Sequence, residues 1–138
     1  MATSISVKSM DHVVLTVKSV DATVKFYTEI LGMKHESFCS PRNPEVTRHA
    51  LIFGNQKINL HSAASPWEPH AQTPLSGSAD LCFLTDMPVE QVHTQLNEAG
   101  VTVLEDNKVV SRVGAVGKLR SVYVRDPDGN LIEISNYE

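Results

Sequence analysis

The chain has 138 residues, 41% of them hydrophobic, and a formal net charge of −4 at pH 7. Its length matches one ordinary domain, and its composition is typical of a globular chain rather than a disordered one. Without an excess of basic residues, a nucleic-acid partner is not expected. No apolar run reaches the about 18 to 20 residues of a membrane span, residues 1–8 contain no secretory apolar segment, and two cysteines provide no disulfide framework. We therefore expect a cytoplasmic protein without a membrane or nucleic-acid partner.

The first part of the chain predicts a strand, a helix and three more strands. Residues 10–17 are mostly apolar and rich in β-branched side chains, which is typical of a buried strand. A helix with one apolar face follows, capped by Asp21 and ended by Gly32. The remaining elements are strands at residues 33–39, 47–53 and 56–61, a loop at residues 40–44 and a tight turn at residues 54–55.

The same order of elements starts again after a connector. Residues 62–78 have no hydrophobic period and contain Pro66, Pro69, Pro74 and Gly77. The second part predicts a strand at residues 79–84, a helix capped by Asp86 and ended by Gly100, strands at 101–110, 119–125 and 130–135, a loop at 111–118 and a turn at 126–129.

Glycine positions support an internal repeat. Gly32 and Gly100 are separated by 68 residues, and so are His12 and Asp80. Such a short repeat indicates two small units that share one sheet system. The predicted fold class is α+β: two βαβββ modules that form an open, curled mixed β-sheet. The domain is expected at residues 9–137, with one module at 9–61, the connector at 62–78 and the other module at 79–137.

Three polar residues stand out because they belong to apolar strands: His12, His61 and Glu133. An ionised glutamate among isoleucine and leucine costs several kcal/mol unless it is paired or bound to a metal. Two imidazoles and one carboxylate are also the ligands of a facial divalent-metal site. Taken singly, each residue has an ordinary structural explanation, as a hydrogen-bonded or solvent-facing side chain. Their equivalent places in a repeat, together with Asp80, favour one metal site.

Three segments of the sequence carry a family resemblance. They are residues 10–17 around His12, residues 26–33 with Phe-Tyr ahead of Leu-Gly, and residues 123–133 with Asp-Pro-Asp-Gly-Asn ahead of Glu133. Together they resemble the vicinal oxygen chelate superfamily, which includes glyoxalase I, fosfomycin- and bleomycin-resistance proteins and extradiol dioxygenases. Within it, residues 53–61 and 77–83 look like the glyoxalase domain-containing protein 5 group.

The resemblance implies a curled barrel of two modules around one divalent ion. The superfamily's ligand positions fall on His12, His61 and Glu133, whereas the fifth-strand position, often histidine, is Asp80 here. That departure leaves open whether Asp80 binds the metal, acts as a base or does neither. Small chains of this superfamily commonly dimerise, so the resemblance also implies a homodimer whose site draws ligands from one chain or from two.

Further residues are candidates for contact with the substrate. Counting by twos from His61 puts Asn59 and Lys57 on the same strand face. Ser121 and Tyr123 match positions that line the substrate in the resembling fosfomycin-resistance proteins, and Tyr123 is equally well explained as a packed aromatic. Arg120, in a basic cluster beside a glycine-rich loop, is a candidate for binding an anion. In the connector, Trp67 and His70 are placed to cover the site, although packing alone would also explain them.

The function that these observations favour is a divalent-metal-dependent, glyoxalase-like lyase or isomerase. Its small substrate would chelate the ion (Zn, Ni, Mn, Co or Fe) through adjacent oxygens, with Glu133 or Asp80 moving a proton and Tyr123 donating to an oxygen. One alternative is a non-haem iron dioxygenase, because two histidines and a carboxylate also bind Fe(II). The other is a non-catalytic small-molecule-binding or resistance protein.

Overall fold

The computed structural model describes residues 2–138, which form two modules with the same element order. The first module contains β1 (His12–Val17), α1 (Val20–Glu29), β2 (Lys34–Ser40), β3 (Asn43–Phe53) and β4 (Gln56–Ser62). The second contains β5 (Asp80–Leu84), α2 (Val89–Glu98), the short α3 (Leu104–Asn107), β6 (Val110–Val113), β7 (Lys118–Arg125) and β8 (Leu131–Tyr137). The predicted α+β fold with two βαβββ-like modules is confirmed.

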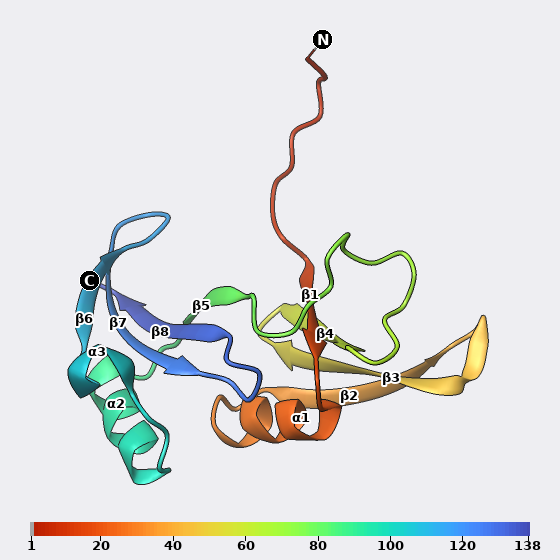
Figure 1. Cartoon of the computed structure of the whole chain (residues 1–138). Coiled ribbons are helices and arrows are strands. Elements are labelled where there is room, and N and C mark those ends of the chain that lie inside the picture. Colours follow the sequence, from red (N-terminus) through yellow and green to blue (C-terminus); the bar gives the residue numbers. More distant parts are fainter. Residues whose placement is uncertain (1) are drawn as a thin grey trace.

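Each module builds one four-stranded mixed sheet. The strand orders are β1-β4-β3-β2 and β5-β8-β7-β6, with parallel pairing of β1 to β4 and of β5 to β8. The first strand of each module is therefore an edge strand. Figure 1 shows β1 and β5 at the inner edges of the two sheets, which stay open, with α1 and α2 below the sheets in this view.

The core lies between the sheets and their helices and continues from one module into the other. On β1 and β4 it takes every second residue, including Val17 and Ile58, both fully buried, and on β8 it takes Ile132. The rings of Phe53 and Phe83 meet edge to face across the modules, with centroids 5.3 Å apart. Since strand side chains alternate, the other residues of these strands face away from the helices.

A buried polar contact also joins the modules. The Tyr27 hydroxyl on α1 donates to Asp126 Oδ2 at 2.7 Å, and the tyrosine is fully buried. Asp126 also accepts from the Asn130 side chain and from the backbone amides of Asp128 and Asn130, which closes the Asp-Pro-Asp-Gly turn. Burial first, and then the Asp126 charge, raise the pKa of Tyr27, so its hydroxyl keeps the proton it donates.

Both predicted helix caps are wrong, for different reasons. α1 is capped by Ser19, whose Oγ accepts from the Ala22 amide at 3.1 Å, and Asp21 lies inside the first turn. α2 has no side-chain cap from Asp86. Instead the Val89 amide donates to Asn136 Oδ1 at 2.7 Å, so the last strand of the chain supplies the cap. A partner 47 residues away cannot be read from the local spacing that identifies ordinary caps.

The strand predicted at residues 101–110 is also wrong. Glu105, Asp106 and Asn107 have φ between 56° and 58°, a left-handed turn that interrupts extended backbone. The strand β6 begins only at Val110 and occupies part of the predicted loop at 111–118. The other predicted strands are confirmed with shifts of a few residues at their ends, and β3 begins four residues earlier than predicted, at Asn43.

Within residues 2–138, the two helices α1 and α2, each of ten residues, are too short to cross a membrane.

Candidate functional site

The candidate site lies on the sheet faces that point away from the helices, here called the open face. In the first module the open face carries His12, Val14 and Thr16 of β1 and their register partners Lys57, Asn59 and His61 of β4. In the second it carries Asp80 and Cys82 of β5, Ser121 and Tyr123 of β7, and Glu133 and Ser135 of β8. Every one of these positions alternates with residues of the core.

His12 opens strand β1 and presents an oriented imidazole. Its Nδ1 lies 2.9 Å from Asp11 Oδ2, with the aspartate largely exposed. A carboxylate at one ring nitrogen fixes the orientation of the imidazole and leaves Nε2 available as a ligand. The pair therefore has the chemistry of a metal-binding histidine with its supporting carboxylate.

Asn59, on β4 beside β1, has a buried polar atom without a partner among residues 2–138. It pairs with Val14 in the register, and its Oδ1 is buried without a hydrogen-bond partner among the described residues. A buried amide oxygen that lacks a donor costs about 1 to 3 kcal/mol. An oxygen in this state is suited to a cation or to a hydrogen-bond donor of a bound molecule.

In the second module Glu133 is held by hydroxyl groups. Its Oε2 accepts from Ser121 Oγ at 2.6 Å and from Ser135 Oγ at 3.3 Å. Both serines are fully buried, and their Oγ atoms lie 2.6 Å apart. The two hydroxyls fix the orientation of the carboxyl group, and Oε1 accepts no hydrogen bond from residues 2–138.

Tyr123 lies opposite Glu133 on the neighbouring strand and keeps its proton at neutral pH. Burial first, and then the Glu133 carboxylate, raise the pKa of the phenol, while Arg112 Nε donates to its oxygen at 3.1 Å. The tyrosine is therefore placed as a neutral hydrogen-bond donor beside the carboxylate.

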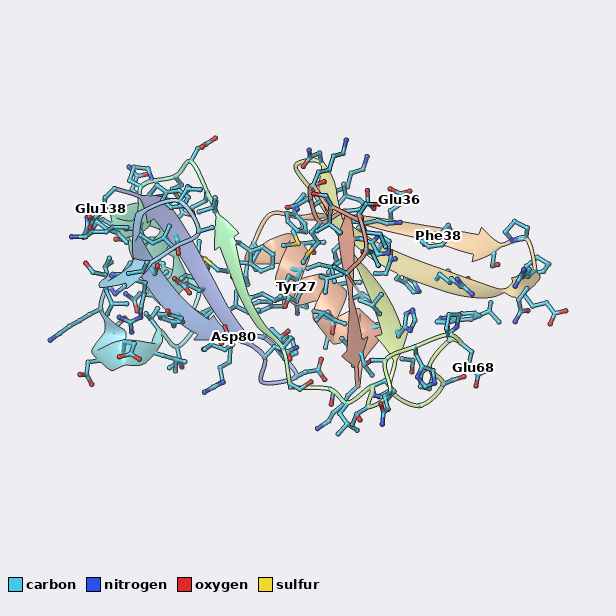
Figure 2. All side chains as sticks on the ribbon, turned by 90° about the horizontal axis from the view of Figure 1, so that it is seen from above. Tyr27, Glu36, Phe38, Glu68, Asp80 and Glu138 are labelled. Carbon is cyan, nitrogen blue, oxygen red and sulfur yellow. The ribbon has the colours of Figure 1, made fainter. Side chains whose placement is uncertain are left out.

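Asp80 is exposed at the first position of β5, on the same face as Glu133. In Figure 2 it lies at the side of the second sheet that faces the first module. His12 holds the same first position of β1, so the predicted equivalence of His12 and Asp80 is confirmed.

The predicted equivalence of His61 and Glu133 is wrong. His12 pairs with Lys57 and Asp80 pairs with Leu131, so the counterpart of Glu133 is Asn59. His61 pairs with Thr16, four residues further along β4 than the partner of His12. At about 3.3 Å per residue this separation is roughly 13 Å, which disfavours one ion bound by both histidines.

The predicted ligands also lie on different sheets. Among residues 2–138, no three histidine, cysteine, aspartate or glutamate side chains are close enough to hold a metal ion together. The donors that suit a divalent ion instead form two half-sites: His12 with Asn59 on the first module, and Asp80 with Glu133 on the second.

Lys57 and Arg120, both predicted to contact the substrate, each have a partner within the chain. Lys57 is on the open face as expected, with Nζ 5.7 Å from the centre of the Phe38 ring, so its charge has an aromatic partner. Arg120 points to the helix side, where it forms an ion pair with Glu90 of α2. Its neighbours Leu119 and Ser121 take the opposite face because strand side chains alternate.

A cavity of about 370 Å³ lies between the open face and the connector. Its lining includes Val14 and His61 from the sheet and Pro69 and His70 from the connector. Figure 2 shows Glu68, in this part of the connector, close to the end of β4. The sequence-based role of His70 in covering this face is therefore supported by its position.

The sequence analysis missed Arg48, which lies beside this cavity. Its guanidinium carbon is 3.7 Å from the centre of the Trp67 ring, and its Nε is buried without a partner among the described residues. Burial first, and then the Arg48 charge, lower the pKa of His61, which keeps that imidazole neutral at pH 7. Counting by twos along β3 from Ala50, whose side chain is buried, would have placed Arg48 on the same strand face.

A second, larger cavity of about 460 Å³ lies on the helix side. It is lined mainly by apolar residues such as Leu31, Met33, Phe83 and Leu96. Because none of the metal-ligating or titratable groups described above lines it, we place the candidate site on the open face.

Comparisons with known proteins identify the family of the chain. The family model described as Glyoxalase/Bleomycin resistance protein/Dioxygenase superfamily matches residues 9–134. The "Virulence protein STM3117" of Salmonella typhimurium is 48% identical over 128 residues, 93% of this chain and 83% of the relative. The "Glyoxalase domain-containing protein RDO1" of Mycosarcoma maydis is 46% identical over 134 residues, 97% of this chain and 71% of the relative.

Solved structures show the same arrangement. The crystal structure of STM3117 matches with a TM-score of 0.86 at 46% identity, covering 97% of this chain and all of that one. An integron cassette protein of V. cholerae matches with a TM-score of 0.88 at 46% identity, covering 97% of this chain and 98% of that one. A lactoylglutathione lyase from Agrobacterium tumefaciens gives 0.65 at 21% identity, covering 92% of each chain, which shows a common fold only.

Proposed function

The chain belongs to the glyoxalase/bleomycin resistance protein/dioxygenase superfamily, and from that premise we propose that it is a divalent-metal-dependent lyase or isomerase. Its substrate is a small molecule that chelates the ion through two adjacent oxygens. The observation that carries the proposal is the pair of half-sites on the open face, with the oriented imidazole of His12 on one module and the hydroxyl-held carboxylate of Glu133 on the other. A closer kinship with the glyoxalase domain-containing protein 5 group stays a prediction.

The donor set fits a borderline divalent ion such as Zn, Ni, Mn, Co or Fe. Imidazole nitrogen and carboxylate oxygen suit all of these ions, and the partnerless Asn59 oxygen adds a hard donor. We propose His12 and Glu133 as ligands, with Asn59 at a third position, and we assign Asp80, at the position equivalent to His12, to proton transfer rather than to the ion. When bound, the ion supplies Lewis acidity to the substrate oxygens.

The chain's own groups provide the proton chemistry. Asp80, exposed at the start of β5, is the group proposed to accept and return a substrate proton. Tyr123 keeps its proton at neutral pH and so donates a hydrogen bond to a substrate oxygen. Ser121 and Ser135 hold Glu133 in one orientation and thereby position it for the ion.

We further propose a homodimer in which each site combines half-sites of two chains. The support is that His12 and Glu133 lie on separate sheets that stay open toward the same side. A symmetric partner that covers this side would set the first module of one chain against the second module of the other.

The test is the metal content of protein purified without chelator, measured by plasma mass spectrometry. About one ion per chain is expected in the wild type, with loss of the ion in His12→Ala and in Glu133→Gln. His61→Ala is the matched histidine control and is expected to keep the ion. Wild-type protein that stays empty after incubation with the five ions would overturn the proposal. Iron in the site with oxygen uptake would favour the dioxygenase alternative.

Mixing the two inactive variants tests whether the site is shared. In a heterodimer, the His12→Ala chain still supplies Glu133 and the Glu133→Gln chain still supplies His12. One of the two sites would therefore have both ligands, and the other would have neither. Random assembly makes half of the dimers mixed, so co-expression should restore about one ion per four chains in a shared site. A site built within one chain would stay empty in every dimer.

A further inference from the structure

We propose that Arg48, together with the imidazoles of His61 and His70, binds a carboxylate group of the substrate, which makes the substrate a small organic acid. The inference rests on the proposed function, because it assigns the substrate class of the same open face. It concerns a subsite distinct from the two half-sites for the metal, and it gives His61 a role other than that of a metal ligand.

Arg48 is a half-buried cation with nothing to neutralise it in the described chain. Among residues 2–138 its guanidinium makes no ion pair and no side-chain hydrogen bond. One face of the guanidinium is covered by the Trp67 ring at 3.7 Å. The ring covers a face of the guanidinium and leaves its in-plane N–H groups, which have no hydrogen-bond partner among residues 2–138, as donors for a carboxylate bound through two parallel hydrogen bonds.

The cavity beside Arg48 supplies further donors. His49 pairs with Leu60, and one more step in this register sets Arg48 opposite His61, which lines the cavity. His70 faces the same cavity from the connector. Arg48 is not among the residues that line the cavity, so we place the anion at the boundary between the cavity and Arg48, where donors from β3, from β4 and from the connector meet.

The internal repeat shows what the equivalent positions do in the second module. The register that equates Asn59 with Glu133 also equates the cross-strand pair Arg48–His61 with Ser121–Ser135. Those two serines hold a carboxylate, that of Glu133. In the first module the central residue is Asn59, so the equivalent pair has no internal carboxylate to hold. This equivalence favours a carboxylate over a phosphate as the ligand.

The position of the subsite limits the size of the acid. His61 is two residues beyond Asn59 on β4, which places the subsite roughly 7 Å along the strand from the proposed metal half-site. The carboxylate is therefore separate from the two chelating oxygens and only a few bonds from them.

Trp67 is the only tryptophan of the chain, so its fluorescence reports on this subsite. The experiment titrates chelator-treated, full-length protein at constant ionic strength with butanoate, its neutral analogue butanamide and inorganic phosphate. We expect a saturable change with butanoate and an at least about tenfold weaker effect with butanamide, because the neutral amide loses the charge-assisted bidentate contact. Phosphate should also bind more weakly than butanoate, because the equivalent pair of residues in the second module holds a carboxylate. Arg48→Met should remove the butanoate response, and Arg48→Lys, which keeps charge but not the planar fork, should weaken it.

Arg42→Met is the control, because Arg42 is an exposed arginine at the β2–β3 turn, and it should respond like the wild type. Circular dichroism checks the fold of each variant, and the comparison of acid with amide needs the wild type alone. Equal responses to butanoate and butanamide, tighter binding of phosphate, or an unchanged response in Arg48→Met would each overturn the inference. Because metal is absent here, failure of this titration and failure of the metal analysis are separate results.

Discussion

The two modules have the same order of strands and helices but differ at the centre of the fourth strand, where the first module has Asn59 and the second has Glu133. In the second module Glu133 is satisfied by two buried serine hydroxyls. In the first, Asn59 and the neighbouring Arg48 both have buried polar atoms without partners. The central carboxylate of the second module is therefore held by the module itself, whereas the buried polar atoms at the corresponding place in the first module have no partner among residues 2–138.

The modules also differ in how their helices are fixed. The cap of α1 is local, because Ser19 accepts from the amide of Ala22 three residues further on, whereas the cap of α2 comes from Asn136 at the end of the chain. The Asp126 turn of the second module in turn binds Tyr27 of the first. The second module therefore carries the long-range contacts, and the following changes are expected to separate local from long-range stabilisation.

The largest loss of stability is expected for Asp126→Ala. The change removes four hydrogen bonds and leaves the fully buried Tyr27 hydroxyl unpaired. We expect a loss of about 3 to 4 kcal/mol in the free energy of unfolding, measured by urea denaturation. Asp86→Ala is the matched control, because Asp86 is exposed and caps nothing, and should lie within about 0.5 kcal/mol of the wild type. Equal losses in both variants would contradict the role of the turn.

Asn136→Ala should be next. Its side chain accepts from the Val89 amide and donates to the carbonyls of Thr85 and Met87. Removing these three bonds should cost about 2 to 3 kcal/mol, against about 1 kcal/mol for the single cap lost in Ser19→Ala. Thermal unfolding followed by circular dichroism measures both. If Ser19→Ala were the more destabilising change, the contrast between a local and a long-range cap would fail.

Ser121→Ala tests the internal carboxylate network. Its hydroxyl donates to Glu133 Oε2 at 2.6 Å, and its loss should cost about 1 to 2 kcal/mol at neutral pH. Ser111→Ala, at an exposed position of β6, serves as the control and should change stability by less than about 0.5 kcal/mol. A double variant with Glu133→Gln shows whether the two losses are coupled, as a network requires.

The smallest effect concerns the two cysteines, one on each module. Partial burial raises the pKa of the Cys82 thiol, with a further contribution from Glu133, so less thiolate is present at pH 8. Both cysteines are exposed, Cys39 on β2 and Cys82 on β5, so the expected contrast comes from the raised pKa of Cys82 and not from access. Alkylation by iodoacetamide, followed by mass spectrometry, should therefore label Cys82 several times more slowly than Cys39. Faster labelling of Cys82 would show that its surroundings are more open than described.

Much of the fold was readable from the sequence because its signals are local. Alternation and β-branched residues identified most strands, and Gly32 and Gly100, both with positive φ, identified the ends of the helices. The interruption at Glu105–Asn107 was not readable, since non-glycine residues in the left-handed region are uncommon.

The candidate site was readable only in part. The internal repeat, the family resemblance and the strand faces that carry His12 and Glu133 could all be predicted from the sequence. The finding that Asn59, not His61, is the counterpart of Glu133 required the structure. The physical reason is that cross-strand hydrogen bonding fixes the register: it separates Asn59 from Glu133 by 74 residues, but His12 from Asp80 by 68, because the second module has longer connections. The same register brings Arg48 opposite His61, a neighbourhood that no spacing along the chain reveals.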